Sequence, residues 1–156
     1  MAYYPHERRS PGVDTALVIR FIATSFIYLF AGLVFLTLSI AGIMNLTRDA
    51  IFILWLFGFV AMIVFGLSYM FASGLTRSSA FINSTVSKEY ILLNIGVVAF
   101  FTGFSGSVSL SVGKPLAITG LIAIMISVAF HLVNMILISR PEKTPTVKKK
   151  GYGDDY

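Results

Sequence analysis

Four long apolar runs, separated by short polar segments, dominate the hydropathy pattern of the chain. They cover about Thr15–Gly42, Ile51–Gly74, Tyr90–Ser109 and Pro115–Ile138. An α-helix needs about 20 residues to cross the roughly 30 Å hydrocarbon core of a bilayer. We therefore expect an all-α fold, a four-span transmembrane helix bundle over residues 15–140, with polar tails at 1–14 and 141–156.

Small residues recur within these runs at helical spacing. Where no hydrophobic effect drives helices together, small residues let backbones approach closely. The expected packing positions are Gly58, Gly66, Gly96, Gly103, Gly106, Gly120, Ala123 and Ser127. Residues 110–114 are expected to form a tight turn, which would make the third and fourth spans antiparallel neighbours. Pro115 would then occupy the first turn of the fourth span.

Composition agrees with a membrane protein. Of 156 residues, 56% are apolar and 12% charged, and the mean hydropathy is +0.85, well outside the soluble range. Because the chain has no Cys, disulfides and thiolate metal sites are excluded.

The basic residues predict the orientation. Ten of the twelve lie in the tails, in or beside the loop between the second and third spans, or at Arg20; only Arg48 and Lys114 lie on the other side. The positive-inside rule therefore predicts a multi-pass protein of the plasma membrane with both termini cytoplasmic. The net charge of +5 is read as this signal, and no nucleic-acid partner is expected. The triplet Lys148–Lys150 is interpreted as a solvated tail, or alternatively as a contact for anionic lipid or an acidic partner.

Two N-glycosylation sequons, at Asn45 and Asn83, fall in the predicted first and second loops. The predicted orientation puts the loop containing Asn83 on the cytoplasmic side, where glycosylation does not occur.

Few residues in the predicted spans offer chemistry. Arg20, Asn94, His131 and Asn134 are expected at similar depth, as a hydrogen-bonded polar layer that clamps the bundle. Contact with a partner subunit or with lipid headgroups is the alternative, and Arg20 is expected to snorkel. Since the four spans as drawn contain no Asp or Glu, neither a proton relay nor a carboxylate metal site is expected. No catalytic residue, metal site or cofactor is predicted.

One alternative keeps a cofactor. His131 and a methionine are able in principle to ligate a haem, and Met62, Met70 and Met125 are available, with Met70 the preferred partner. A small haem- or quinone-binding redox protein is therefore the second hypothesis. A transporter or channel is disfavoured because the predicted spans carry little charge and show no internal repeat.

The second span carries a family resemblance. The segment Leu54–Tyr69, LWLFGFVAMIVFGLSY, resembles a helix of haem-copper oxidase subunit I, in particular its short four-span, C-type oxidase and nitric oxide reductase-like relatives. That family's ligand-bearing members have His five residues before the glycine and directly after the tyrosine. Here Ile53 and Met70 occupy these positions. The resemblance implies a four-span scaffold without haem or metal ligation.

The leading functional hypothesis is a non-catalytic accessory or structural subunit of a multi-subunit, energy-converting membrane complex, such as a terminal oxidase or a membrane monooxygenase. Its expected partners are membrane lipids and other membrane subunits. It is supported by the small-residue packing faces and by the oxidase-like helix without its ligands.

Overall fold

The structure, a computed structural model, describes residues 13–75, 80–106 and 108–139, without the side chains of residues 73–75 and 80–82. Every element within these ranges is a helix: α1 (Thr15–Ile40), α2 (Arg48–Ile53), the π-helix η1 (Leu54–Ala61), α3 (Met62–Leu75), α4 (Ala80–Phe104) and α5 (Leu110–Ser139). Four helical stretches are long and apolar enough to cross a membrane, with α2, η1 and α3 following one another without a break. The expected four-span helical bundle is confirmed. The predicted tails beyond Val13 and Ser139 lie outside the described residues, as does Arg77.

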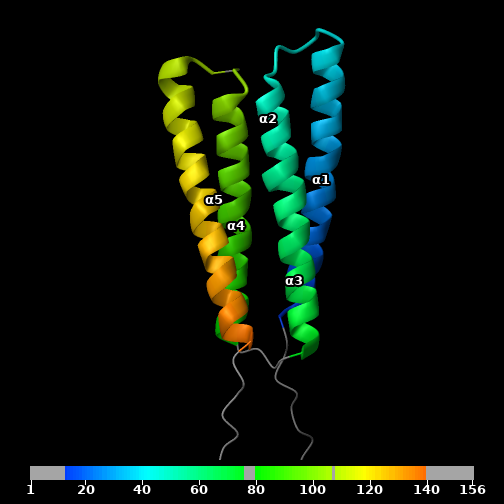
Figure 1. Ribbon diagram of the computed structural model, residues 1–156, viewed down its shortest axis with the longest axis vertical. Helices are drawn as coiled ribbons and strands as arrows, with labels where there is room; N and C mark the ends of the chain where they lie inside the picture. The colour runs from blue at the N-terminus through cyan, green and yellow to red at the C-terminus, as the bar shows by residue number, and fades with distance from the viewer. Residues whose placement is uncertain (1–12, 76–79, 107, 140–156) are drawn as a thin grey trace, which may run out of the picture.

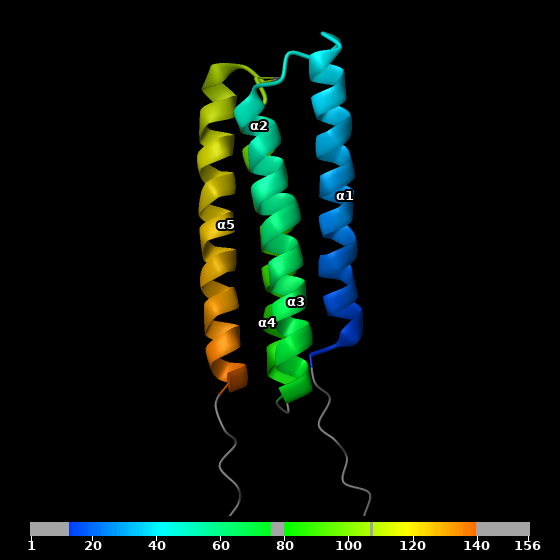
Figure 2. The ribbon, with the colours of Figure 1, turned by 45° about the vertical axis from the view of Figure 1, so that its right-hand side comes forward.

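The helices form two hairpins that stand side by side (Figures 1 and 2). The first hairpin consists of α1 and the α2–η1–α3 rod, and the second of α4 and α5. The connection at residues 41–47 and the ends of α4 and α5 at residues 104–106 and 108–110 lie at the same end of the bundle, here called the turn end, which is uppermost in Figure 1. The opposite end, where α1 and α4 begin and α3 and α5 finish, is called the terminal end.

Polar residues set several helix ends. The Asp14 side chain accepts a hydrogen bond from the Ala16 N–H at the start of α1, and the Thr47 side chain accepts one from the Ala50 N–H at the start of α2. After α1 the chain turns through Gly42, whose φ of +70° lies in the left-handed region that glycine adopts without strain.

Two predicted boundaries are wrong. Helix α4 begins at Ala80, ten residues before the expected Tyr90, and the stretch that can cross a membrane begins at Asn83, so the polar segment containing Asn83 and Glu89 is helical and belongs to the span. The fourth span begins at Leu110, so residues 110–114 form its first turn, and Pro115 lies in the second turn. The antiparallel arrangement of these two spans is as expected (Figure 1).

A single line of buried residues, the α5 seam, faces the rest of the bundle. Its members alternate in steps of three and four, the spacing that keeps one helical face against a partner. They are Gly113, Ala117, Gly120, Ile124, Ser127, His131, Asn134 and Ile138. The seam residues have mostly small side chains toward the turn end and include polar side chains toward the terminal end.

Small residues bring α4 and α5 into backbone contact. A Cβ added at Gly103 would lie 2.5 Å from the Ala117 nitrogen, and one added at Gly120 would lie 2.4 Å from the Phe100 nitrogen. No side chain fits there, so the expected packing role of Gly103 and Gly120 is observed. Gly96 packs in the same way against Ile124.

Of the other predicted packing positions, some lie between helices as expected and Gly106 does not. Gly58 lies against the Tyr28 ring and Gly66 against Phe21, so both hold the rod against α1, while Ser127 is buried on the α5 seam and Ala123 is half-buried. Gly106 does not pack between helices: it follows α4 with a φ of +79°, and its role is the left-handed turn.

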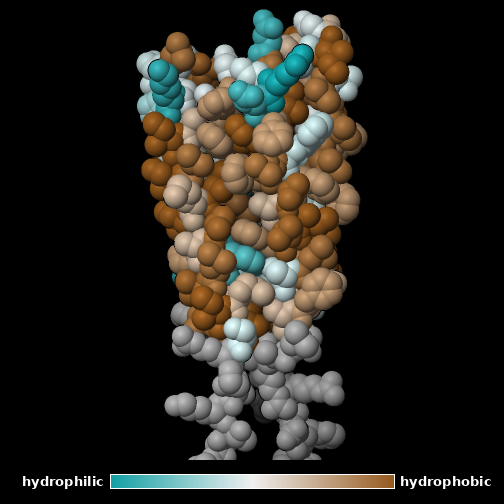
Figure 3. Space-filling model, in the orientation of Figure 1, coloured by the Kyte–Doolittle hydropathy of each residue, from teal (hydrophilic) through white to brown (hydrophobic). Residues whose placement is uncertain are grey.

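Two hydrogen bonds connect α1 with α4 across the hairpins. The hydroxyls of Thr24 and Tyr90 lie 2.7 Å apart, and the Tyr28 hydroxyl donates to Asn94 Oδ1 at 2.9 Å. Most of the bundle's outer surface is apolar, as Figure 3 shows for one face. This surface suits contact with lipid tails.

Candidate functional site: a buried carboxylate, imidazole and phenol cluster

Glu89 lies at the centre of a polar cluster inside the bundle. It belongs to α4, and its exposed fraction is 0%. It is buried because it shares a face of α4 with Val86, Leu93 and Gly96, again in steps of three and four, and these neighbours are buried as well. Glu89 is the tenth residue of α4, about 14 Å along the helix from its first residue. A carboxyl group therefore lies within a membrane span.

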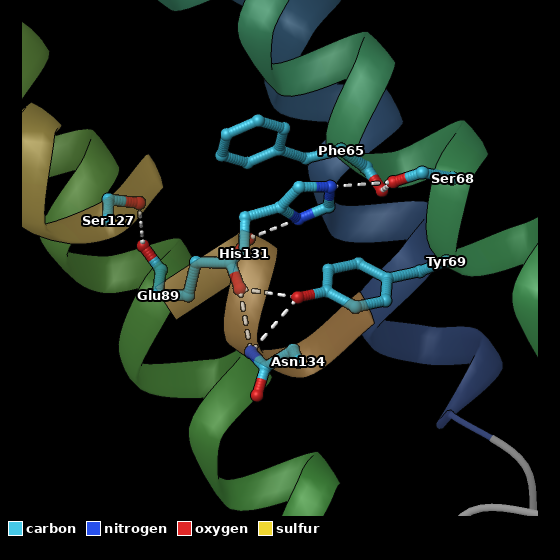
Figure 4. A network of polar contacts seen from close by, with 7 residues as sticks. All are labelled: Phe65, Ser68, Tyr69, Glu89, Ser127, His131 and Asn134. Atoms are coloured by element: carbon cyan, nitrogen blue, oxygen red, sulfur yellow. Dashed lines mark hydrogen bonds and ion pairs between the residues drawn. The ribbon is translucent and has the colours of Figure 1, made fainter. Parts of the chain in front are cut away.

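The α5 seam supplies three partners to this glutamate. His131 Nδ1 lies 3.0 Å from Glu89 Oε1, and the Asn134 amide nitrogen donates to Oε2 at 2.9 Å. One turn further toward the turn end, the Ser127 hydroxyl donates to the Glu89 carbonyl at 3.1 Å. Figure 4 shows His131 and Asn134 meeting the carboxylate, and Ser127 meeting the backbone carbonyl of Glu89.

The first hairpin closes the cluster through α3. The Tyr69 hydroxyl donates to Glu89 Oε2 and accepts a 3.0 Å hydrogen bond from the Asn134 amide. The Ser68 hydroxyl lies 3.0 Å from His131 Nε2 and donates to the Phe65 carbonyl at 2.9 Å. The Phe65 ring stacks on the imidazole with centroids 3.9 Å apart and planes within 1° (Figure 4). Both ring nitrogens and one ring face of His131 are thus occupied.

His131 and Glu89 face each other and can act as proton donor and acceptor. A hydrogen on Nδ1 lets the imidazole donate to Glu89 Oε1, and Nε2 can bond the Ser68 hydroxyl in either direction, depending on the tautomer. With hydrogens on both ring nitrogens and none on the carboxylate, the pair is an imidazolium and a carboxylate with no net charge.

Pairing explains how these groups are tolerated in a membrane span. An unpaired ion in a low-dielectric interior is costly, whereas a paired ion that also receives hydrogen bonds is much less so. Oε2 of Glu89 accepts from both Tyr69 and Asn134, so both carboxyl oxygens have partners. One polar atom of the cluster has none among the described residues: the buried Oδ1 of Asn134.

The expected polar layer forms only in part. His131 and Asn134 come together, but around Glu89 and Tyr69. Asn94 bonds Tyr28 at a separate position, and its amide donates to the Tyr90 carbonyl. Arg20 is exposed on α1 and takes no part in the cluster. The expected layer of Arg20, Asn94, His131 and Asn134 is therefore wrong as a single unit.

Sequence reasoning missed the central residue. The polar segment before Tyr90 leaves Glu89 outside the predicted third span, and the expectation that the spans contain no acidic residue is wrong. The signal was present in the spacing of Val86, Glu89, Leu93 and Gly96, which continues the buried face of the span upstream of Tyr90.

The expected alternative ligand pair, His131 and Met70, is not brought together. Met70 is 47% exposed, while the ring of His131 is buried between Phe65, Ser68 and Glu89. A haem at His131 would require Nε2 to leave Ser68 and Met70 to turn inward.

Comparison with known proteins finds no matching family model, curated protein or solved structure. The resemblance of Leu54–Tyr69 to an oxidase helix therefore stays a prediction, and the functional argument depends on the cluster.

Proposed function

We propose that this chain is a proton-exchanging, non-catalytic subunit of a larger membrane complex. The observation that carries the proposal is the 3.0 Å contact between the His131 imidazole and the buried Glu89 carboxyl group inside a membrane span. Ionisable residues within membrane spans are expensive to retain, and they commonly mark ion or proton pathways. A stabilising clamp would need only neutral hydrogen bonds, such as the one between Tyr28 and Asn94.

The residues of the cluster suit a proton better than a metal ion. Within the described part of the chain, no group of three or more His, Cys, Asp or Glu side chains converges as a metal site would require. Glu89 and His131 are instead joined by hydroxyl and amide groups, which can pass or orient protons. Tyr69 and Ser68 connect the pair to the first hairpin.

A subunit role is supported by the setting that the sequence predicts, because energy-converting membrane complexes use intramembrane ionisable residues in proton pathways. The groove described below is lined by residues near the turn end, and none of its lining residues belongs to the cluster.

The proposed setting is the plasma membrane with both termini cytoplasmic, supported by the distribution of ten of the twelve basic residues. In that orientation the cluster belongs to the cytoplasmic half of the bilayer, because His131 lies eight residues, about 12 Å, from the last residue of α5. Its proton would exchange with the cytoplasm.

Infrared difference spectroscopy of the full chain in lipid nanodiscs, between about pH 5 and about pH 9, tests the proton role. We expect carboxyl and imidazole bands that change together and that disappear in Glu89→Gln. The matched control Asp49→Asn, an exposed carboxylate in α2, should leave these bands intact. A wild-type spectrum with no Glu89-dependent change would contradict the proposal.

Copurification tests the subunit role separately. In mild detergent the native protein should migrate on a native gel with other membrane proteins. Migration as a monomer or a pure homo-oligomer would reject the subunit role while leaving the proton site open to the spectroscopic test.

A further inference from the structure

A second feature lies at the opposite end of the bundle from the cluster. An apolar groove with a volume of about 690 Å³ opens between α4 and α5 near the turn end. Its walls include Phe100, Phe104, Leu110, Ile118 and Leu121, and its floor is formed where Gly103 and Gly113 bring the two helices together. The proposed function does not use this groove.

One cation belongs to the groove. Lys114 lines the groove, is the fifth residue of α5, and is exposed. Within the described ranges no carboxylate lies within ion-pair distance of its ammonium group. The groove therefore combines an apolar channel with one uncompensated positive charge.

The dimensions and position of the groove suit a lipid. On α5 its lining runs from Leu110 to Leu121, about 16 Å along the helix, entirely on a membrane-spanning element. Lys114 lies about 6 Å from the start of α5, close to where a bilayer's headgroups would begin. Exposed apolar side chains at Phe104, Ile118 and Leu121 make the groove continuous with the lipid-facing surface.

We propose that this groove binds an anionic phospholipid, with an acyl chain along the α4–α5 groove and the phosphate beside Lys114. The apolar walls shield the acyl chain from water, and the unpaired ammonium group of Lys114 supplies the charge that selects an anionic headgroup. All the lining residues named above come from the two packed helices, for example Phe100 from α4 and Leu121 from α5, so a bound lipid would contact both helices of the second hairpin.

Native mass spectrometry of the full chain tests this proposal, with phosphatidylglycerol and phosphatidylcholine of identical acyl chains as probes. We expect retained phosphatidylglycerol to exceed phosphatidylcholine by about fivefold, the effect of one basic residue near a membrane surface. Lys114→Gln should remove this preference. Arg48→Gln removes an exposed charge from the same end without touching the groove and should leave the preference unchanged.

A second pair of variants tests the apolar part. Leu121→Trp fills the groove and should lower retention of both lipids, whereas Ile122→Trp, on the neighbouring exposed position outside the lining, should not. The proposal would be overturned if both lipids were retained equally and Lys114→Gln left their retention unchanged. It would also be overturned by full competition by soluble glycerol 1-phosphate, or by a Leu121→Trp effect confined to oligomeric state, which would indicate a second copy as the occupant.

Discussion

His131 Nδ1 lies 3.0 Å from Oε1 of Glu89, across the contact between α5 and α4. Neither residue is near a helix end, and the remaining hydrogen bonds of both side chains are made with side chains of the bundle. The two residues therefore depend on each other for a tolerable electrostatic environment, and that dependence is measurable.

Substituting either partner of this pair should destabilise the bundle strongly. Removing one member of a buried ion pair leaves the other uncompensated, at a cost of about 3–5 kcal/mol. We expect Glu89→Leu and His131→Leu each to fall in this range, and the double variant to cost less than the sum of the two. Equilibrium unfolding in detergent measures all three; strictly additive losses would contradict a coupled pair.

The neutral bond between Tyr28 and Asn94 should contribute much less. Interhelical hydrogen bonds in membrane proteins couple by about 0.6 kcal/mol on average. A double-mutant cycle with Tyr28→Phe and Asn94→Ala should give a coupling energy near this value, well below that of Glu89 and His131. Comparable coupling in the two cycles would mean that charge adds nothing to the cluster.

Substituting Arg20 should change the stability of the folded bundle very little. Arg20 is exposed on α1, outside the polar cluster, so Arg20→Gln should change the free energy of unfolding by no more than about 0.5 kcal/mol. The same unfolding titration serves as the measurement. A loss of several kcal/mol would restore the polar layer that the sequence suggested.

The glycines of the second hairpin should differ sharply from one another. Gly120→Val places a branched side chain where even a Cβ would lie 2.4 Å from the Phe100 nitrogen, so α4 and α5 must separate. We expect loss of the folded bundle, seen as faster proteolysis and a collapsed thermal transition. Gly106→Asn should be mild, because Asn tolerates the left-handed backbone that Gly106 adopts. Similar outcomes for both variants would contradict these two roles.

The sequence predicted the four spans because length and apolar content alone determine whether a helix can cross a bilayer. It misplaced the start of the third span, since a hydropathy sum counts polar residues as excluded from the membrane. Inside a bundle those residues can bond one another: Asn83 accepts from the Asp14 N–H, and Glu89 bonds three side chains.

The prediction of the polar layer is wrong for a different reason. Depth was inferred from position along each helix, but direction around the helix decides which residues meet. Arg20 lies in α1, at a distance from Thr15 at the start of the helix that suits the layer. Around the helix axis, however, its side chain is rotated by about 100° from that of its buried neighbour Phe21, so it faces outward. His131 and Asn134 succeeded because both belong to the α5 seam.

The seam also bears on how the protein enters its membrane. Two of the partners of the Glu89 carboxyl group, His131 and Asn134, lie on the same helical hairpin as Glu89 itself. The α4–α5 hairpin can therefore be inserted as one unit with its acidic group already compensated, before Tyr69 and Ser68 of the earlier-made hairpin dock against it. Biosynthesis in chain order would then never leave this carboxylate bare in lipid.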